Sequence, residues 1–192
     1  SGVVGQLTLT VKPRIQTITI TGEGGATAVL EGQALQLTAA TNPADAADTV
    51  VWSSANPTVA AVDENGLITA GRVNADTRVV ITATAADLTG VAGAPVVKQT
   101  FTLTVKAIVN ITAITLTPAT VSVIGLNTVK LNAAVSPAAA TYPKVLWTRA
   151  NETVATVDEN GLVTAGDVDQ ATTVAITATA DDENHKTASR TV

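Results

Sequence analysis

The stretch VDENGLITAG at residues 62–71 returns as VDENGLVTAG at residues 157–166, with one substitution in ten positions. In the first copy, apolar Val62 and Leu67 flank the polar run Asp-Glu-Asn-Gly. Such a run reverses the chain, because the Asp side chain accepts backbone hydrogen bonds while Asn and Gly tolerate positive φ. The stretch therefore predicts a tight β-hairpin that the fold builds twice.

The acids of this stretch also raise the alternative of a repeated cation site. A calcium loop of the helix-loop-helix type needs acids at alternate positions, a distant bidentate Glu and flanking helices, and the sequence offers none of these. We therefore expect structural roles for Asp63 and Gly66 in the first copy and for Asp158 and Gly161 in the second. The Asp caps the turn, and the Gly adopts a backbone conformation that costs other residues energy.

The repeat extends well beyond the turn. Residues 50–87 align without a gap with residues 145–182, and 25 of these 38 positions are identical. Self-similarity at such a period is typical of tandem modules, each of about 90 residues. The sequence therefore predicts one domain at residues 13–107 and a second at residues 108–192.

The first twelve residues are interpreted separately. GQLTLTVKP at residues 5–13 matches QTFTLTVKA at residues 99–107, so residues 1–12 are expected to be the remnant last strand of a preceding repeat. Such a strand without its own sheet is expected to be disordered or to pair with another sheet edge, including that of a neighbouring molecule. The linker KAIVN at residues 106–110 contains no Gly or Ser, which predicts a stiff connection between the domains.

Hydrophobic periodicity predicts the secondary structure. In RVVITATAA at residues 78–86, every second residue from Val79 to Ala85 is apolar, which is typical of a strand with one side in a core. No helical period competes, and many short strands with turn signals between them predict an all-β fold. About seven strands are expected in each antiparallel β-sandwich, with Trp52 and Trp147 buried between the sheets. In the first domain the expected strands are 15–20, 33–40, 49–54, 58–62, 67–70, 78–86 and 97–105.

Composition excludes several functions. A net charge of −5 without basic clusters is unlike a nucleic-acid-binding surface, so no nucleic-acid partner is expected. The absence of Cys excludes disulfides and thiolate metal sites. No apolar run of about 20 residues is present, so this sequence is not expected to insert into a membrane.

The search for catalytic chemistry finds no complete set. His185 is the single His of the chain, and there is no Cys and no nucleophile elbow, so neither a catalytic residue nor a cofactor site is expected. The best remaining cation candidates are Asp181, Asp182 and Glu183, whose oxygens would suit calcium. The alternative for this cluster is a charged, flexible loop.

The repeated core carries a family resemblance. WSSANPTVAAVDENGLIT at residues 52–69 and WTRANETVATVDENGLVT at residues 147–164, each followed by ITATA, resemble the bacterial immunoglobulin-like (Ig-like) domain of group 2. This family occurs in intimin- and invasin-type adhesins, other bacterial surface proteins, accessory regions of secreted enzymes and some phage virion proteins. The links RVNADTR at residues 72–78 and DVDQATT at residues 167–173 are longer than is usual in the family.

The resemblance implies two tandem Ig-like β-sandwiches without enzymatic activity. It implies an extracellular or cell-surface location on a bacterium and a role as a stiff spacer or stalk for adhesion. Two alternatives stay open, namely a module whose loops bind a host protein or glycan and an accessory domain of a phage virion protein. The expected partners are neighbouring Ig-like repeats of the same chain and an unknown surface ligand, and we expect a monomer.

Overall fold

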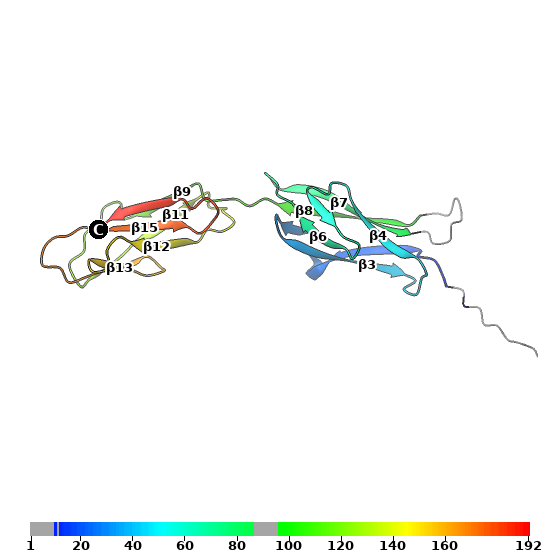
Figure 1. Cartoon of the computed structure of the whole chain (residues 1–192), viewed down its shortest axis with the longest axis horizontal. Helices are drawn as coiled ribbons and strands as arrows, with labels where there is room; N and C mark the ends of the chain where they lie inside the picture. Colours follow the sequence, from blue (N-terminus) through cyan, green and yellow to red (C-terminus); the bar gives the residue numbers. More distant parts are fainter. Residues whose placement is uncertain (1–9, 11, 87–95) are drawn as a thin grey trace, which may run out of the picture. The chain divides into compact units, whose positions relative to one another are not determined.

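The computed structural model describes residue 10 and residues 12–86 and 96–192 (Figure 1). The chain divides into two compact units, Ser1–Ala107 and Ile108–Val192, which are called domain 1 and domain 2 below. In the described residues, the one helical element is a short 3-10 turn, η1 (Glu23–Gly25). The predicted all-β fold is confirmed. The expected pairing of residues 6–12 falls largely outside the described residues.

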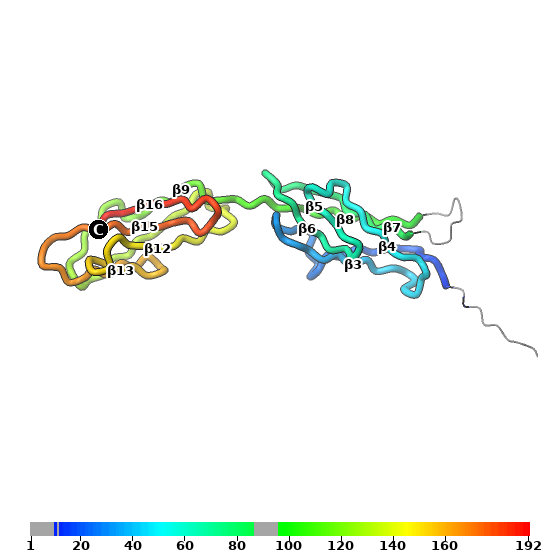
Figure 2. Tube along the Cα trace, viewed as in Figure 1, coloured from blue at the N-terminus to red at the C-terminus, as the bar shows by residue number. Residues whose placement is uncertain are grey.

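Domain 1 is a sandwich of two four-stranded sheets, in the orders β1-β3-β6-β5 and β2-β8-β7-β4. All strand pairs are antiparallel except β2 with β8, which is parallel. Figure 2 shows the chain crossing between these layers. The strands are β1 (Thr17–Gly22), β2 (Ala28–Leu30), β3 (Ala34–Asn42), β4 (Thr49–Ser54), β5 (Ala60–Val62), β6 (Leu67–Ala70), β7 (Thr77–Ala86) and β8 (Lys98–Lys106).

The core of domain 1 lies between the two sheets. The alternating apolar residues of β7 are buried: Val79 and Ile81 pack in one cluster with Leu37 and Ile68 of the opposite sheet, and the following two alanines pack in a second cluster with Ile18. Burial of a Val, Leu or Ile side chain stabilises a fold by roughly 1.5–3 kcal/mol, so these clusters make a large favourable contribution to the stability of the domain. The buried residues of β7 therefore follow the two-residue apolar period that the sequence shows.

Domain 2 repeats this arrangement with more interruptions. Its sheets are β9-β11, β10-β14-β13 and β12-β15-β16, all antiparallel. The strands are β9 (Ala113–Thr117), β10 (Thr128–Lys130), β11 (Asn132–Ser136), β12 (Val145–Arg149), β13 (Ala155–Val157), β14 (Leu162–Ala165), β15 (Ala175–Ala180) and β16 (Thr187–Thr191).

Each domain has eight strands in the described residues, where the sequence predicts about seven. In domain 1 the additional strand is β2, a three-residue strand that pairs with the end of β8. In domain 2 the additional strand arises because β10 and β11 together correspond to β3. The first part of β3 pairs with β6 and the remainder with β1, and in domain 2 the two parts separate at Leu131.

Candidate functional site

The repeated stretch forms a tight turn between β5 and β6. Asp63 Oδ1 accepts the backbone N–H groups of Asn65 (2.9 Å) and Leu67 (2.8 Å). The backbone adds two bonds, from the Asp63 N–H to the Leu67 carbonyl (3.1 Å) and from the Gly66 N–H to the Asp63 carbonyl (3.1 Å). One carboxylate therefore satisfies two donors that the turn would otherwise leave to water.

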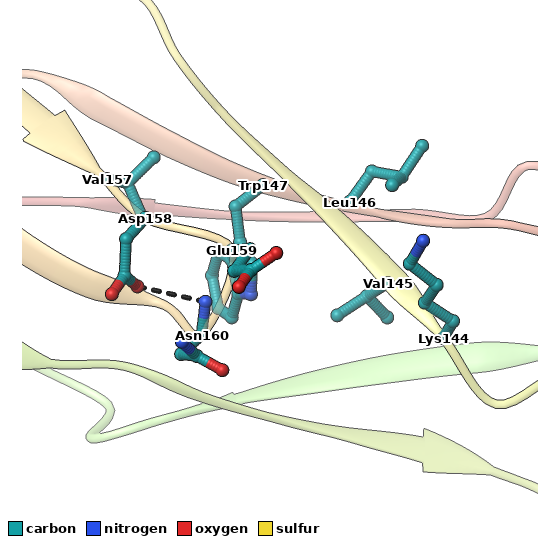
Figure 3. A pocket seen from close by; sticks show the side chains of 8 residues that line it. All are labelled: Lys144, Val145, Leu146, Trp147, Val157, Asp158, Glu159 and Asn160. Atoms are coloured by element: carbon teal, nitrogen blue, oxygen red, sulfur yellow. Dashed lines mark hydrogen bonds between the residues drawn. The ribbon is translucent and has the colours of Figure 1, made fainter.

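The turn between β13 and β14 is built in the same way. Asp158 Oδ1 accepts the N–H groups of Asn160 (2.9 Å) and Leu162 (2.7 Å), and Figure 3 shows the first of these bonds. The backbone hydrogen bond from Leu162, more than any other interaction, holds the pKa of Asp158 below its ordinary value of 3.8. The anionic form of Asp158 is thus the form that stabilises this turn.

A side chain from the neighbouring strand fastens each turn from outside. In domain 1, Gln36 Nε2 donates to the carbonyl of Asn65 (2.8 Å). In domain 2, the Lys130 ammonium donates to the carbonyl of Asn160. Gln36 and Lys130 occupy equivalent places, because the residue after each of them, Leu37 or Leu131, donates its N–H to the glycine carbonyl of the turn at 2.9 Å in both domains. Comparison of the two repeats does not reveal that these residues are equivalent, because Gln36 carries an amide and Lys130 an ammonium group.

The turn glycines are fixed by both conformation and contact. Gly66 and Gly161 have a φ of 80°, which is the left-handed region. A Cβ on Gly66 would lie 2.7 Å from the Leu37 carbonyl oxygen and 2.9 Å from Trp52 Cε2. On Gly161 it would lie 2.7 Å from Trp147 Cζ2. Each turn therefore folds back onto the indole of the facing sheet, and this contact explains why the motif pairs a Trp with a distant Gly.

The sequence predicts that both Trp side chains are buried between the sheets, and the structure shows both packed against the core but only partly buried. Each indole also contacts the turn glycine, and part of the ring remains exposed at the open side of the sandwich. This side is open because β4 and β12 are the last strands of their sheets. Trp52 contacts two apolar clusters, whereas Trp147 contacts one.

A groove follows the open side of domain 2. It has a volume of about 470 Å³ and is lined by residues from β12 and from the β13–β14 turn (Figure 3). The polar and aromatic groups of its lining are the Trp147 ring, the Lys144 ammonium group, the carboxylates of Asp158 and Glu159, and the Asn160 amide. Such a set suits a small polar ligand, and its two carboxylates are fewer than the three ligands of a metal group.

The predicted cation candidates Asp181, Asp182 and Glu183 border the same shallow groove, but their carboxylates are directed to different partners. Asp181 faces Lys144, with its Oδ2 3.7 Å from the ammonium group. Asp182 is 8% exposed and turns inward. Across the described ranges, no group of three acidic, His or Cys side chains is placed to hold a metal ion. His185 and the exposed Tyr142 complete the lining of the groove that the three acids border.

Asp182 instead holds the first strand of domain 2. Its Oδ2 accepts the N–H of Ile111 (2.6 Å), and its Oδ1 accepts those of Asn184 (3.1 Å) and His185 (3.2 Å). Ile111 is fully buried, so its N–H depends on this acceptor. The acid cluster is therefore a structural element with one buried member.

In domain 1 the equivalent backbone N–H group is accepted by a different residue. The N–H of Ile15, which corresponds to Ile111, is accepted by Asp48 Oδ2 at 2.8 Å. Asp48 precedes β4, and its side chain is 2% exposed. At the position of Asp48 the second copy has Pro143, so comparison of the repeats could not reveal this function. The sequence counterpart of Asp182 is Asp87, which lies outside the described residues.

Removal of the Asp182 carboxylate should destabilise domain 2 strongly. We expect Asp182→Ala to lower the free energy of unfolding by about 2–3 kcal/mol, because the buried N–H of Ile111 loses its acceptor. The matched control is Asp181→Ala, which removes an exposed ion pair and should change stability by less than about 0.5 kcal/mol. Urea unfolding followed by circular dichroism measures both, and equal effects of the two variants would contradict the role of Asp182.

The lowered pKa of Asp158 predicts a pH-dependent stability. Because the folded-state pKa lies below 3.8, the stabilisation by the anion is present above pH 3.8 and is lost as the pH falls through the folded-state pKa. We expect Asp158→Asn to lower the melting temperature at neutral pH and the difference to shrink at acidic pH. Glu159→Gln, on the outer side of the same turn, is the charge-matched control. A pH-independent difference for Asp158→Asn would refute this account.

The fold and the paired turns define a class of protein, that of Ig-like β-sandwiches joined in tandem. The family model of the bacterial Ig-like domain (group 2) matches residues 14–96 and 110–191. The chain belongs to this family, as the repeated core predicts.

A relative and two solved structures show further similarity. An Ig-like virion protein of Serratia phage KSP90 is 34% identical over 173 residues, which are 88% of this chain and 62% of that protein. The chain thus spans less than two thirds of this relative. The crystal structure of the S-layer protein rSbsC(31-844) has a TM-score of 0.56 at 17% identity, over 95% of this chain and 28% of that one. The crystal structure of domains 4 and 5 of the S-layer protein SbsC has a TM-score of 0.54 at 15% identity, over 94% of this chain and 98% of that one.

At these identities the likeness to the S-layer structures shows the fold. Within the part of the chain that the structure describes, no helix is long and apolar enough to cross a membrane.

Proposed function

We propose that this chain is a non-catalytic spacer of an extracellular protein, either on a bacterial surface or in a phage virion. Membership of the bacterial Ig-like family and the similarity to an Ig-like virion protein support this setting. The spacer role is supported by the way each domain fastens its end of the linker.

The linker is bound at both of its ends, and this is the observation that carries the proposal. The N–H of Ala107 donates to Asp76 Oδ1 in domain 1 (3.0 Å). On the other side, the N–H of Val109 donates to Thr141 Oγ1 (2.8 Å), and the carbonyl of Val109 accepts the N–H of Thr141 (2.8 Å). Ile108 is the one residue between these attachments.

Few rotatable bonds therefore separate the two domains. Each residue outside a hydrogen-bonded element contributes two soft dihedral angles, so a one-residue gap leaves little freedom compared with a Gly/Ser linker. A spacer needs this property, since a free hinge would let consecutive modules fold back on one another. In this proposal the neighbouring repeats of the parent chain are the partners of the module.

Pulsed electron paramagnetic resonance can test the spacer role. The chain has no native Cys, so Glu64→Cys and Glu159→Cys place one spin label on the exposed turn of each domain. We expect a narrow distribution of label distances. Insertion of Gly-Gly-Ser-Gly after Ile108 should broaden it clearly, and Asp76→Ala combined with Thr141→Val should broaden it in part. A distribution that is already as broad as that of the insertion variant would refute the spacer role.

A second candidate function is recognition of a glycan in the groove beside Trp147. The partly exposed indole favours it, because sugars stack on aromatic rings while amides, ammonium groups and carboxylates bind their hydroxyls. In a Trp52→Phe background, a neutral hexose oligosaccharide and a uronic-acid oligosaccharide should each be tested for quenching of Trp147 fluorescence. Lys144→Ala should weaken a genuine response. Unchanged fluorescence with both probes would exclude binding of these sugars in the groove.

A further inference from the structure

Each of the two equivalent turns exposes an Asn that is followed by Gly. Asn65 precedes Gly66 and Asn160 precedes Gly161, and both Asn residues are exposed. A Gly has no side chain to shield its backbone nitrogen, so this nitrogen can approach the side-chain amide of the Asn before it. The two turns are therefore places where the backbone can react with an Asn side chain.

The reaction is deamidation through a cyclic imide. The Gly nitrogen loses its proton to hydroxide and bonds to the side-chain carbonyl carbon of the Asn. The bond from that carbon to the amide nitrogen breaks, and ammonia leaves with a proton taken from water. Water then opens the imide at either carbonyl, which gives Asp or isoAsp. In total one water is consumed and one ammonia is released, without an oxidant or a cofactor.

The attacking nitrogen and the Asn backbone carbonyl belong to the same peptide group. When the nitrogen loses its proton, the negative charge is shared with the oxygen of that carbonyl. A hydrogen-bond donor on the oxygen therefore stabilises the reactive anion, and a cationic donor stabilises it more than a neutral one. The side chain that binds the Asn carbonyl thus influences how readily the Gly nitrogen attacks.

The two domains place different donors on this oxygen. In domain 2 the Lys130 ammonium group donates to the carbonyl of Asn160. In domain 1 the neutral amide of Gln36 donates to the carbonyl of Asn65 at 2.8 Å. Only the peptide group between Asn160 and Gly161 is therefore in direct contact with a positive charge among these two.

The other features of the two turns are closely matched. The sequence VDENGL is the same at residues 62–67 and 157–162. In both turns the Asp carboxylate accepts two backbone N–H groups at 2.7–2.9 Å. The N–H of Gly66 donates to the Asp carbonyl at 3.1 Å and that of Gly161 at 3.0 Å, and both glycines have a φ of 80°. The chain thus contains its own matched comparison of a cationic with a neutral donor.

We propose that Asn160 is a deamidation site that Lys130 activates, and that it reacts faster than Asn65. The ammonium group stabilises the deprotonated peptide group of Asn160 and Gly161, which is the nucleophile of the reaction. The hydrogen bond from the Gly161 N–H to the Asp158 carbonyl has to open first. The same bond has to open in domain 1, so it does not account for a difference between the two sites.

Formation of isoAsp changes the packing of the turn. In isoAsp the main chain passes through the former side chain, which adds one carbon atom to the backbone directly before Gly161. The turn has no room there, because even a Cβ on Gly161 would lie 2.6 Å from the Leu131 carbonyl oxygen and 2.7 Å from Trp147 Cζ2. The turn therefore has to move away from the indole, and the modified domain 2 should unfold at a lower urea concentration.

Peptide mass mapping that separates Asn, Asp and isoAsp can follow both sites in the intact chain at mildly alkaline pH. We expect Asn160 of the folded protein to react roughly three- to tenfold faster than Asn65. In urea-denatured protein the two rates should be equal, because the local sequences are the same. Lys130→Gln should slow Asn160 to about the rate of Asn65, and Gln36→Lys should accelerate Asn65 by a similar factor.

Lys144 provides the charge-matched control. It lines a groove together with Lys130 and Asn160, but its ammonium group faces Asp181 at 3.7 Å, and Figure 3 shows its side chain apart from Asn160. Lys144→Gln should therefore leave the rate at Asn160 unchanged.

Urea unfolding of the Lys130→Gln variant separates a direct effect from a change in the opening of the turn. We expect its stability to stay close to that of the unmodified protein, since Gln is the residue that domain 1 uses at this place. Equal rates at Asn65 and Asn160 in the folded chain, or equal slowing by Lys130→Gln and Lys144→Gln, would overturn the proposal. A slowing by Lys130→Gln that only matches a gain in stability would overturn it as well.

Discussion

Replacement of Gly66 by Ala should destabilise domain 1 by about 3 kcal/mol. The left-handed conformation alone costs a residue with a Cβ about 1–2 kcal/mol. The new methyl group would also lie 2.7 Å from the Leu37 carbonyl oxygen and 2.9 Å from Trp52 Cε2, so either the turn or the indole has to move. Overpacking of this kind adds about 1–3 kcal/mol. Urea unfolding monitored by Trp52 fluorescence in a Trp147→Phe background isolates domain 1.

Gly32 provides the matched control for this prediction. Its φ is 75°, close to the 80° of Gly66, but a Cβ on Gly32 would meet no atom within 4 Å. Gly32→Ala should therefore cost about 1 kcal/mol, the conformational part of the effect. The difference between the two variants measures the contact between the turn and the Trp. Equal costs would mean that this contact contributes nothing to the repeated motif.

The features of the fold that the sequence predicts are those with a strong local signal. The nine-residue alternation in β7 and the paired Asp and Gly of the turns each specify a backbone conformation without reference to distant parts of the chain. The repeat then transfers each of these predictions to the second domain. Strand boundaries in domain 1 differ from the expected ones by about two residues, the usual uncertainty of such predictions.

The features that the sequence does not predict depend on contacts between distant segments. β2 is three residues long and therefore has no period of its own, and it is a strand because the end of β8 lies beside it. The role of Asp182 depends on the direction of one side chain. A run of acids in a sequence predicts a solvated loop or a cation site. Only the structure shows that Asp182, the middle acid, accepts the N–H of Ile111.

The partial exposure of the Trp side chains illustrates the same limit. The sequence correctly places Trp52 and Trp147 at equivalent positions on equivalent strands. The degree of burial depends on the edge position of those strands, which follows from sheet order and not from the motif. An edge strand leaves one side of each ring without a neighbouring strand to cover it.

The two Trp residues should nevertheless differ in their contribution to stability. Trp52 contacts both apolar clusters of domain 1 and thereby joins its two halves, whereas Trp147 contacts one cluster in domain 2. Truncation of a large buried aromatic side chain costs 3–5 kcal/mol, through lost contacts and the cavity that remains. We therefore expect Trp52→Ala to cost about 4 kcal/mol, and Trp147→Ala, whose indole also borders the open groove, to cost about 3 kcal/mol.

Differential scanning calorimetry of the whole chain can measure these costs, because a variant in one domain should shift the transition of that domain and leave the other in place. Trp52→Phe and Trp147→Phe are the matched controls, since Phe retains a ring against the core but does not reach as far toward the turn glycine. If Trp147→Ala proved the more destabilising variant, the two-cluster contact of Trp52 would not be what sets the stability of these sandwiches. The contact between the turn glycine and the Trp, which both domains share, would then be the common source of the stability that the two Trp residues contribute.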